Sequence, residues 1–395
     1  MRVVVGAGFL LASVWAALSE PALRQSREAP DHQIDVLFSP LTSPEDPGCA
    51  VLVKRDGKIL FEKGYGVREL RTGSKNDAQS NFRLASFTKQ FTAMAVLLLI
   101  HDGKLQYEDR LTDIFPEFPA YGKSITVREL LTHTSGLPDY EELMQKEEKV
   151  KGPLWSAEHQ IQDPEVLALL ERQGSGKFVP GTKWAYSNSG YVVLGLIVAK
   201  VSGMPYRDFL EKRIFSPLGM AHSIVYQKGI NVVPDRAFGY SREGNQFVET
   251  DQSPTSATLG DSRVYSNLQD LSKWDDALDQ HTLLSEKEML PAYTPVKLAD
   301  GSLPRWPGGA DEEERAGQTV LYGFGWFLDP YESHPRMYHT GSTRGFRTVI
   351  ERFPGDRLTI VILANRLDLN PRALSEQIAS LLLSKPGASG EFLPR

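Results

Sequence analysis

The chain has almost no cysteine: Cys49 is the only one among 395 residues. A single cysteine cannot form a disulfide within the chain or build a thiolate metal site. Cys49 begins a strand-like apolar run, so we expect it to be a small buried side chain. The sequence also lacks a His-Glu-x-x-His motif and paired carboxylates at metal-ligand spacing. We therefore expect no metal and no other cofactor.

The chain also lacks an excess of positive charge. Its formal net charge is −6 at pH 7. A protein that binds nucleic acid usually carries a basic patch or stripe, so we expect no nucleic-acid partner. Hydrophobic residues make up 41% of the chain and charged residues 24%, which is typical of a globular protein with a sizeable core.

Long hydrophobic runs are absent except at the N-terminus. Arg2 is followed by an apolar run over residues 3–18, and Ala17-Leu18-Ser19 resembles a cleavage site for a signal peptidase. This pattern predicts a secretory signal peptide over residues 1–19 and a secreted or periplasmic protein, with no stable membrane insertion after its removal. An uncleaved anchor is the alternative, because the N-terminal region has a single positive charge.

The remaining pattern predicts an α+β fold. Residues 20–46 are polar and unpatterned, which is typical of a linker with a short helix near residues 31–37. We expect one domain over residues 47–385, a helical subdomain at about residues 124–265, and a C-terminal tail over residues 386–395. Strands are expected at 49–54, 59–64, 322–328, 336–340, 348–352 and 358–364. Helices are expected at 91–101, 126–131, 164–172, 190–201, 268–278 and 371–383. Strands at both chain ends and helices between them indicate one antiparallel sheet with an inserted helical part.

Two stretches have the composition of loops. Residues 143–163 are rich in charge, and residues 299–318 are rich in glycine and acidic residues. Loops of this length within a compact domain are usually functional or mobile, so we expect them to form the walls that select the substrate.

Ser86 and Lys89 stand three residues apart, just before the expected helix at 91–101. On a helix, this spacing puts both side chains on one face, about 5–6 Å apart at Cβ. A lysine at that distance lowers the cost of removing the serine proton, as a nucleophilic serine without a histidine base requires. The pair alone fits an exposed polar helix face equally well, because such a spacing arises about once by chance in a chain of this composition.

Tyr-Ser-Asn occurs twice, as Tyr186-Ser187-Asn188 and over residues 265–267. A tyrosine phenol can relay a proton when a nearby cation lowers its pKa, and an asparagine amide can bind a substrate amide. We favour the first copy, which follows a Pro-Gly turn and precedes a helix. The second copy leads directly into the helix at 268–278, where its serine or asparagine is more simply an N-cap.

A third segment, His339-Thr340-Gly341-Ser342, ends an expected strand. A glycine at a strand edge lets a substrate backbone approach closely. The N–H groups of Ser86 and Ser342 could together form an oxyanion hole, in which one donor typically contributes about 2.7–4 kcal/mol of transition-state stabilisation.

The order Ser-x-x-Lys, Tyr-Ser-Asn and His-Thr-Gly resembles the class C β-lactamase-like serine hydrolases. This group includes penicillin-binding proteins, D-aminopeptidases, D-Ala-D-Ala carboxypeptidases and esterases. Residues 125–137 and 264–274 also look like signature segments of the group, and the resemblance covers about residues 48–384. It implies a β-lactamase/transpeptidase-like fold, an antiparallel sheet flanked by helices.

The resemblance also implies roles. Ser86 would attack an acyl carbonyl and form an acyl-enzyme. Lys89 would be the base, or it would keep the phenol of Tyr186 ionised. Tyr186 would pass the proton to the leaving group and later activate water, and Asn188 would bind the acyl side chain. The sequence leaves open whether Lys89 or Tyr186 is the formal base.

The chain departs from the family pattern at two places. His339 stands where a lysine is more familiar, and a neutral imidazole would weaken binding of a substrate carboxylate. Arg344 and Arg347 lie just beyond it and could replace the lost charge. Residues 260–263 lack the double glycine expected there, which puts the shape of one wall of the site in doubt.

We expect a secreted serine hydrolase that cleaves an ester, an amide or a β-lactam of a small molecule or peptide through Ser86. One alternative is a D-Ala-D-Ala carboxypeptidase, a penicillin-binding protein that acts on cell-wall peptides. The other is a non-catalytic binding protein on the same fold. The presence of Ser86, Lys89, Tyr186 and Asn188 argues against it, since a scaffold has no need of all four.

Overall fold

The structure is a computed structural model that describes residues 30–41, 43–307 and 315–383. The signal peptide predicted over residues 1–19 and the tail predicted over residues 386–395 lie outside these ranges. The strands are β1 (Cys49–Arg55), β2 (Lys58–Tyr65), β3 (Val67–Glu69), β4 (Ser74–Lys75), β5 (Phe82–Arg83), β6 (Ile224–Val225), β7 (Tyr240–Glu243), β8 (Gln246–Glu249), β9 (Val264–Ser266), β10 (Met337–Thr343), β11 (Phe346–Phe353) and β12 (Leu358–Ala364).

The α-helices are α1 (Pro30–Phe38), α2 (Lys89–His101), α3 (Leu111–Ile114), α4 (Val127–Leu131), α5 (Tyr140–Lys151), α6 (Asp163–Glu171), α7 (Asn188–Ser202), α8 (Tyr206–Leu210), α9 (Leu268–Asp279), α10 (Glu286–Met289) and α11 (Pro371–Leu382). Short 3₁₀ turns are η1 (Ser39–Leu41), η2 (Ala85–Thr88), η3 (Ala120–Ser124), η5 (Leu290–Tyr293) and η7 (Pro354–Asp356), and a π-helical turn is η4 (Glu211–Phe215).

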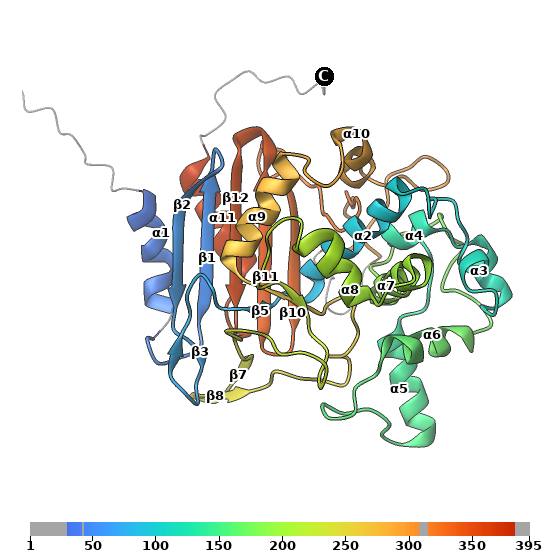
Figure 1. Cartoon of the computed structure of the whole chain (residues 1–395), viewed down its shortest axis with the longest axis horizontal. Helices are drawn as coiled ribbons and strands as arrows, with labels where there is room; N and C mark the ends of the chain where they lie inside the picture. Colours follow the sequence, from blue (N-terminus) through green and yellow to red (C-terminus); the bar gives the residue numbers. More distant parts are fainter. Residues whose placement is uncertain (1–29, 42, 308–314, 384–395) are drawn as a thin grey trace, which may run out of the picture.

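The main sheet has five antiparallel strands in the order β10-β11-β12-β1-β2. The two ends of the chain meet in its interior, because β1 pairs with β12, with Val51 opposite Ile362. The N-terminal hairpin therefore completes a sheet whose other three strands lie within residues 337–364. The α+β layout predicted from the sequence is confirmed (Figure 1).

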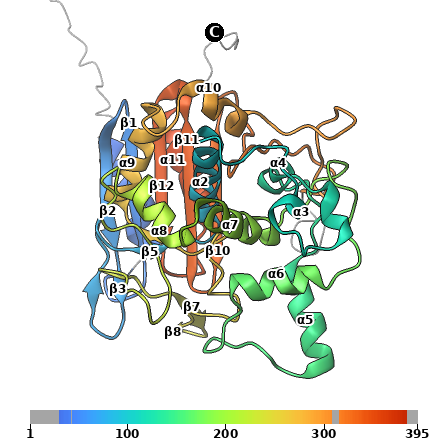
Figure 2. The ribbon, with the colours of Figure 1, turned by 45° about the vertical axis from the view of Figure 1, so that its right-hand side comes forward.

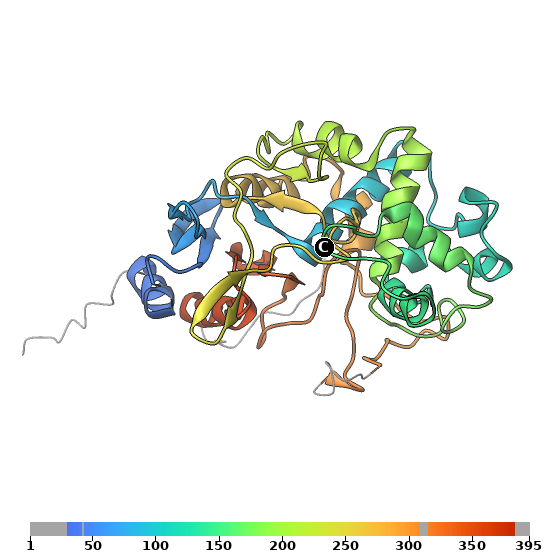
Figure 3. The same cartoon turned by 90° about the horizontal axis from the view of Figure 1, so that it is seen from below.

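Alternation along β1 divides the core between the two faces of this sheet. Val51 and Val53 pack in a cluster with residues of α1 and α11. Ala50 and Leu52 belong to the larger cluster on the other face, with residues of α2 and α9. Figure 3 shows α1 in blue and α11 in red on one side of the sheet, and α9 in gold on the other. Because both faces are covered here, the adjacent strands β1 and β12 are buried along almost their whole length.

Helix α1 corrects the linker predicted over residues 20–46. Its Ile34 and Phe38 are fully buried, and Phe38 stacks on Tyr65 of β2 with ring centroids 5.3 Å apart. The short helix expected near residues 31–37 is present, but it packs on the sheet. The folded domain therefore includes residues that precede position 47.

The helical part lies beside the sheet, with α2 between the sheet and α7 (Figures 1 and 2). The section over residues 124–265 contains helices α4 to α8, joined by loops, and it also contributes the short strands β6 to β9. No single described helix is long and apolar enough to cross a membrane. Two consecutive helical segments, Asn188–Ser202 and Tyr206–Phe215, are together long and apolar enough, but the chain bends by 77° between them.

The loop predicted over residues 143–163 is wrong in its first half, where the chain forms α5. Asp139 caps this helix by accepting hydrogen bonds from the N–H groups of Glu141 and Glu142. Glu147 and Lys151, four residues apart, form an ion pair on its exposed side. The charge that suggested a loop therefore belongs to a solvated helix face.

The strand predicted over residues 322–328 is also wrong. Tyr322 and Phe327 form only an isolated bridge, and the chain between them turns at Gly325 with φ of 75°. A Cβ atom at Gly325 would lie 3.0 Å from the backbone of Gln90 in α2. The segment is apolar because its turn packs against α2, and it touches the sheet only through an isolated bridge between Phe327 and Tyr338 of β10.

Candidate active site

Ser86 lies in η2 and Lys89 is the first residue of α2, so one continuous helical segment positions both. The Nζ atom of Lys89 donates a hydrogen bond to Oγ of Ser86 at 3.0 Å. Ala85, immediately before the serine, has φ of 52°, a conformation that is uncommon for a residue with a Cβ atom. Strained backbone of this kind is held in place by its surroundings and is frequent at functional sites.

Two neighbouring segments hold this turn in place. Thr348 of β11 donates from its Oγ1 to the carbonyl of Leu84 at 2.8 Å. Thr88 accepts from the N–H of Val264 in β9 at 3.1 Å. The serine is thus tied to the main sheet on one side and to the small three-stranded sheet of β5, β9 and β6 on the other.

The Lys89 side chain is fully buried and makes three hydrogen bonds. Besides Ser86, its Nζ donates to Oδ1 of Asn188 at 2.9 Å and to the carbonyl of Asp261 at 3.1 Å. An ammonium group has three N–H donors, so the three acceptors satisfy it completely. The site therefore accommodates Lys89 in its charged form without leaving a donor unpaired.

Tyr186 lies beside this lysine. The Lys89 Nζ is 4.9 Å from the centroid of the Tyr186 ring and 5.5 Å from that of Tyr191. Ser86, Tyr186 and Asn188 are all half-buried, while Lys89 is enclosed beneath them. The structure thus brings the four residues singled out by the motifs into one site, although Asn188 lies 99 residues from Lys89.

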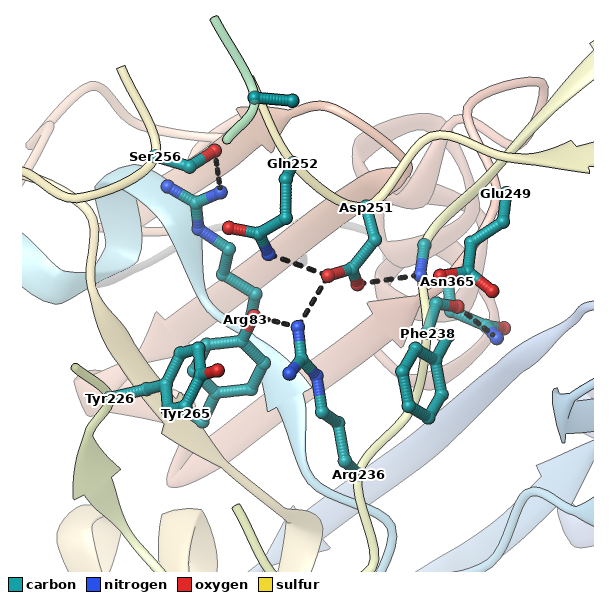
Figure 4. A network of polar contacts seen from close by, with 12 residues as sticks. Arg83, Tyr226, Arg236, Phe238, Glu249, Asp251, Gln252, Ser256, Tyr265 and Asn365 are labelled. Atoms are coloured by element: carbon teal, nitrogen blue, oxygen red, sulfur yellow. Dashed lines mark hydrogen bonds and ion pairs between the residues drawn. The ribbon is translucent and has the colours of Figure 1, made fainter. Parts of the chain in front are cut away.

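The second Tyr-Ser-Asn segment lies elsewhere. Tyr265 is fully buried in β9, where its hydroxyl accepts from Nη2 of Arg236 at 3.3 Å. Figure 4 shows Arg236 beside Tyr265 and Tyr226 and linked to Asp251. Asn267 caps α9 by accepting from the N–H of Asp270 at 2.9 Å. This copy supports the fold and has no contact with Lys89.

His133 packs against Tyr186 from within the fold, with ring centroids 4.4 Å apart. Its Nδ1 accepts a hydrogen bond from the N–H of Ser187 at 3.1 Å, so Nε2 carries the proton of the neutral ring. Burial, followed by the charge of Lys89, holds the pKa of His133 well below its ordinary value. The ring thus supports Tyr186 as an uncharged platform. From the sequence, we expect this histidine to organise backbone and not to catalyse, and its hydrogen bond from the Ser187 N–H is of that kind.

His339 lies in β10 and is almost completely buried. Its Nδ1 donates to the carbonyl of Thr340 at 2.7 Å, and the Tyr322 hydroxyl lies 3.4 Å from its Nε2. Burial, followed by the charge of Lys89, lowers the pKa of His339 to about 3. The imidazole is therefore neutral, and it lies behind Tyr186 with little surface for a substrate to contact.

Gly341 lets β10 approach the nucleophile segment. A Cβ atom there would lie 2.1 Å from the carbonyl oxygen of Leu84 and 2.3 Å from Oγ1 of Thr348, so any side chain would force the two segments apart. β10 is the edge strand of the sheet. At Gly341 one face of this edge strand therefore packs directly against the turn that carries Ser86.

The backbone of Ser342 faces the open edge of β10. Tyr338 exchanges both of its backbone hydrogen bonds with Phe327, on the side away from β11. Backbone groups alternate along an antiparallel strand with a period of two, so Thr340 and Ser342 present their N–H groups on that same side. No described residue accepts from the Ser342 N–H, which is therefore free to bind a substrate oxygen.

Two contributors to the site could not be read from the motifs. The Asp261 carbonyl comes from the segment that departs from the family pattern, and only the fold places it on Lys89. The ring of Tyr191 comes from the first turns of α7. Among the described residues, no group of three or more His, Cys, Asp or Glu side chains is arranged to hold a metal ion.

Comparison with known proteins identifies the relatives of this site and fold. The model of a family described as "Beta-lactamase" matches residues 40–384. Penicillin-binding protein 4* of Bacillus subtilis is 32% identical over 348 residues, which cover 84% of this chain and 71% of that protein.

Solved structures show the same fold. An octameric penicillin-binding protein homologue from Pyrococcus abyssi is 25% identical, with a TM-score of 0.71 over 89% of this chain and 76% of that one. A class C β-lactamase is 21% identical, with a TM-score of 0.70 over 92% of this chain and 99% of that one. The β-lactamase/transpeptidase-like fold expected from the motifs is thereby confirmed. The chain belongs to the β-lactamase family of serine hydrolases and penicillin-binding proteins.

Proposed function

We propose that this protein is a serine hydrolase that cleaves an ester, an amide or a β-lactam through an acyl-enzyme on Ser86. The observation that carries the proposal is the hydrogen bond of 3.0 Å between Lys89 and Ser86, at a half-buried serine beside an open strand edge. A buried lysine next to a serine hydroxyl stabilises the alkoxide that must form when the serine attacks a carbonyl.

In the first step Ser86 Oγ bonds to the substrate carbonyl carbon and its proton passes to Lys89 or Tyr186. The three acceptors around Lys89 favour an ammonium in the resting site. That arrangement favours Tyr186 as the group that receives the proton, a role that it can fill only as the phenolate, with the Lys89 charge stabilising that form. The same group would then protonate the leaving group and later take a proton from the hydrolytic water.

The carbonyl oxygen would become negative in this step. We assign the N–H groups of Ser86 and Ser342 as its two donors. The outward direction of Ser342 on β10 and the close approach of β10 at Gly341 support this assignment. Donors fixed by a strand and a helical turn need no rearrangement during the reaction, which makes them effective.

Penicillin-binding proteins and a D-amino acid amidase of Ochrobactrum anthropi are among the similar proteins, so amides and β-lactams stand beside esters as candidate substrates. A D-Ala-D-Ala carboxypeptidase is the second candidate, favoured by the penicillin-binding relatives. We also propose that the protein is secreted, from the charge and apolar pattern of residues 1–19.

Kinetics with a substrate panel test the proposal. Purified protein without residues 1–19 is mixed with 4-nitrophenyl esters, D-amino-acid amides and a chromogenic cephalosporin. We expect turnover of at least one class, and loss of that turnover in Ser86→Ala. The exposed Ser39 provides a matched control, Ser39→Ala, which retains it. If folded Ser86→Ala hydrolyses the panel as fast as wild type, the assignment of the nucleophile is wrong.

A further inference from the structure

A cavity of about 600 Å³ extends from Ser342 between the β10–β11 hairpin and helix α5. It is large enough for an amino acid or a short peptide. Its walls carry charges of opposite sign on opposite sides. Arg344 and Arg347 come from the hairpin, and Glu141 and Glu148 come from α5.

The hairpin presents its two arginines to solvent. Arg347 is directly opposite Ser342 in the β10–β11 ladder, which puts the two side chains on the same face of the strands. Arg344 stands in the tight turn next to Gly345, whose φ is 71°. Both arginines are exposed, and neither forms an ion pair with another described residue. A guanidinium that is left unpaired in a cavity is available to bind an anionic group.

The two glutamates of α5 differ. The Glu148 carboxylate accepts hydrogen bonds from the N–H groups of Leu154 and Trp155 at 3.0 and 3.1 Å, so it is already used in the fold. Glu141 forms no ion pair with any described residue. Its carboxylate remains available to bind a cationic group.

The surroundings of Glu141 connect the cavity to the nucleophile. Desolvation, and then repulsion from Asp139 and Asp261, raises the pKa of Glu141 to about 7, while the charge of Lys89 lowers it. Glu141 and Ser342, the proposed oxyanion donor, line the same cavity, so the carboxyl lies close enough for the Lys89 charge to act on it. A bound cation would relieve the repulsion that Glu141 experiences.

We propose that this cavity recognises a zwitterionic substrate, whose carboxylate binds Arg344 and Arg347 and whose ammonium binds Glu141. The inference rests on the proposed hydrolase function, since it names the substrate class of the same site. It also accounts for the position of His339. A buried neutral histidine cannot hold a carboxylate, and the adjoining hairpin supplies the cations instead.

The test is calorimetric binding of alanyl-alanine, in its L,L and D,D forms, to the full folded protein at about pH 8, above the Glu141 pKa of about 7. The N-acetyl, C-terminal amide and doubly blocked peptides are measured alongside. We expect the zwitterion of at least one stereoisomer to bind about tenfold or more tightly than its doubly blocked form. Raising the salt from about 0.05 M to about 0.5 M should reduce the difference in affinity between the zwitterion and the doubly blocked form.

Three variants assign the charges. In Arg344→Gln and Arg347→Gln, a peptide with a free carboxylate should bind no more tightly than its C-terminal amide. In Glu141→Gln, a peptide with a free amine should bind no more tightly than its N-acetyl form. Matched controls are Glu142→Gln on the same helix, whose partner is Lys177, and Arg357→Gln in the turn between β11 and β12, whose partner is Asp56. Both controls should bind like wild type.

The inference is overturned if the four forms of both stereoisomers bind equally, or if the charge advantage survives in all three variants. Because binding is measured without turnover, the result is independent of the substrate panel. A protein that hydrolyses neutral esters but ignores peptide charge would keep the proposed function and lose this inference. A protein that binds the zwitterion but hydrolyses nothing would lose the proposed function and keep this inference.

Discussion

The Nζ atom of Lys89 lies 3.0 Å from the Oγ atom of Ser86, and no part of the lysine is exposed to solvent. A charge enclosed in this way interacts with its neighbours more strongly than a charge at the surface, because little water screens it. The same ammonium also bonds Asn188 and Asp261, so the lysine joins three separate segments of the chain at the nucleophile.

Replacing this lysine should abolish catalysis. We expect Lys89→Met to lower kcat by about 10²–10⁴-fold, because the variant removes the proton acceptor or the charge that stabilises it. Pre-steady-state hydrolysis of the best ester in the panel measures the acylation rate. Circular dichroism checks that the variant folds. A folded Lys89→Met with the acylation rate of wild type would contradict the role of the lysine.

The two Tyr-Ser-Asn segments should respond differently to loss of a hydroxyl. Tyr186→Phe keeps the ring beside Lys89 but removes the proton relay, so we expect kcat to fall about 10²–10⁴-fold. Tyr265→Phe removes one hydrogen bond to Arg236 and should lower the stability by about 0.5–1.5 kcal/mol while turnover persists. Steady-state kinetics and urea unfolding measure the two effects. Loss of turnover in Tyr265→Phe alone would show that the wrong copy was assigned.

The buried histidines should make the fold sensitive to acid. His339 has a pKa of about 3 in the folded protein, below the ordinary value of 6.5, so the unfolded chain binds its proton first as the pH falls. The stability is therefore greatest above about pH 6.5 and decreases toward acid, with a slope of up to ~1.4 kcal/mol per pH unit from this group.

Urea unfolding between about pH 7 and pH 5 measures this slope in wild type and in His339→Gln. The variant is expected to lose part of the slope, whatever its stability at neutral pH. His133, whose pKa is also lowered, contributes in the same direction and remains in the variant. An identical slope in both proteins would show that His339 does not titrate on unfolding.

An ion-pair network under α9 should contribute strongly to stability. The buried Asp275 carboxylate accepts from Arg352 at 2.7 Å and from Thr359 at 2.7 Å, and it pairs with Lys54 at 3.1 Å. Burial alone raises the pKa of Asp275, but Arg352, Thr359 and Lys54 together outweigh it and hold this pKa below its ordinary value. The carboxylate is therefore charged. It joins α9 to two buried cations of the sheet, Lys54 in β1 and Arg352 in β11.

Removing that charge leaves Lys54 paired only with the more exposed Asp276, and Arg352 paired only with the more exposed Asp279. Because both cations lose their one buried partner, we expect Asp275→Asn to lower the free energy of unfolding by roughly 3–5 kcal/mol. The neighbouring Asp276 pairs with the same lysine at 2.6 Å but its side chain is 39% exposed. Asp276→Asn should therefore cost less than about 1 kcal/mol. Urea unfolding compares the two. Equal losses would mean that burial does not set the strength of these pairs.

Local sequence patterns were sufficient where one segment determines its own structure. Short apolar segments located β1, β11 and β12, and the helix expected at residues 126–131 corresponds to α4, whose start Thr126 and Glu129 cap. The Asn267 cap was predictable for the same reason. Each of these features depends on residues only a few positions apart.

Features that depend on distant partners were missed. Helix α1 looked like a linker because its apolar residues, Ile34 and Phe38, make sense only against the sheet. The apolar segment at residues 322–328 looked like a strand because its contact with α2 is invisible in sequence. The opposed charges of Arg347 and Glu141 lie 206 positions apart, and only the fold places them on one cavity.

Covalent labelling of the nucleophile tests the central claim most directly. The protein is treated with a fluorophosphonate and, separately, with a fluorescent penicillin, and the labelled peptide is sequenced by mass spectrometry. The account predicts a single adduct on Ser86, absent from Ser86→Ala and reduced in Lys89→Met. An adduct on another serine, or no adduct on folded wild-type protein with either probe, would contradict it.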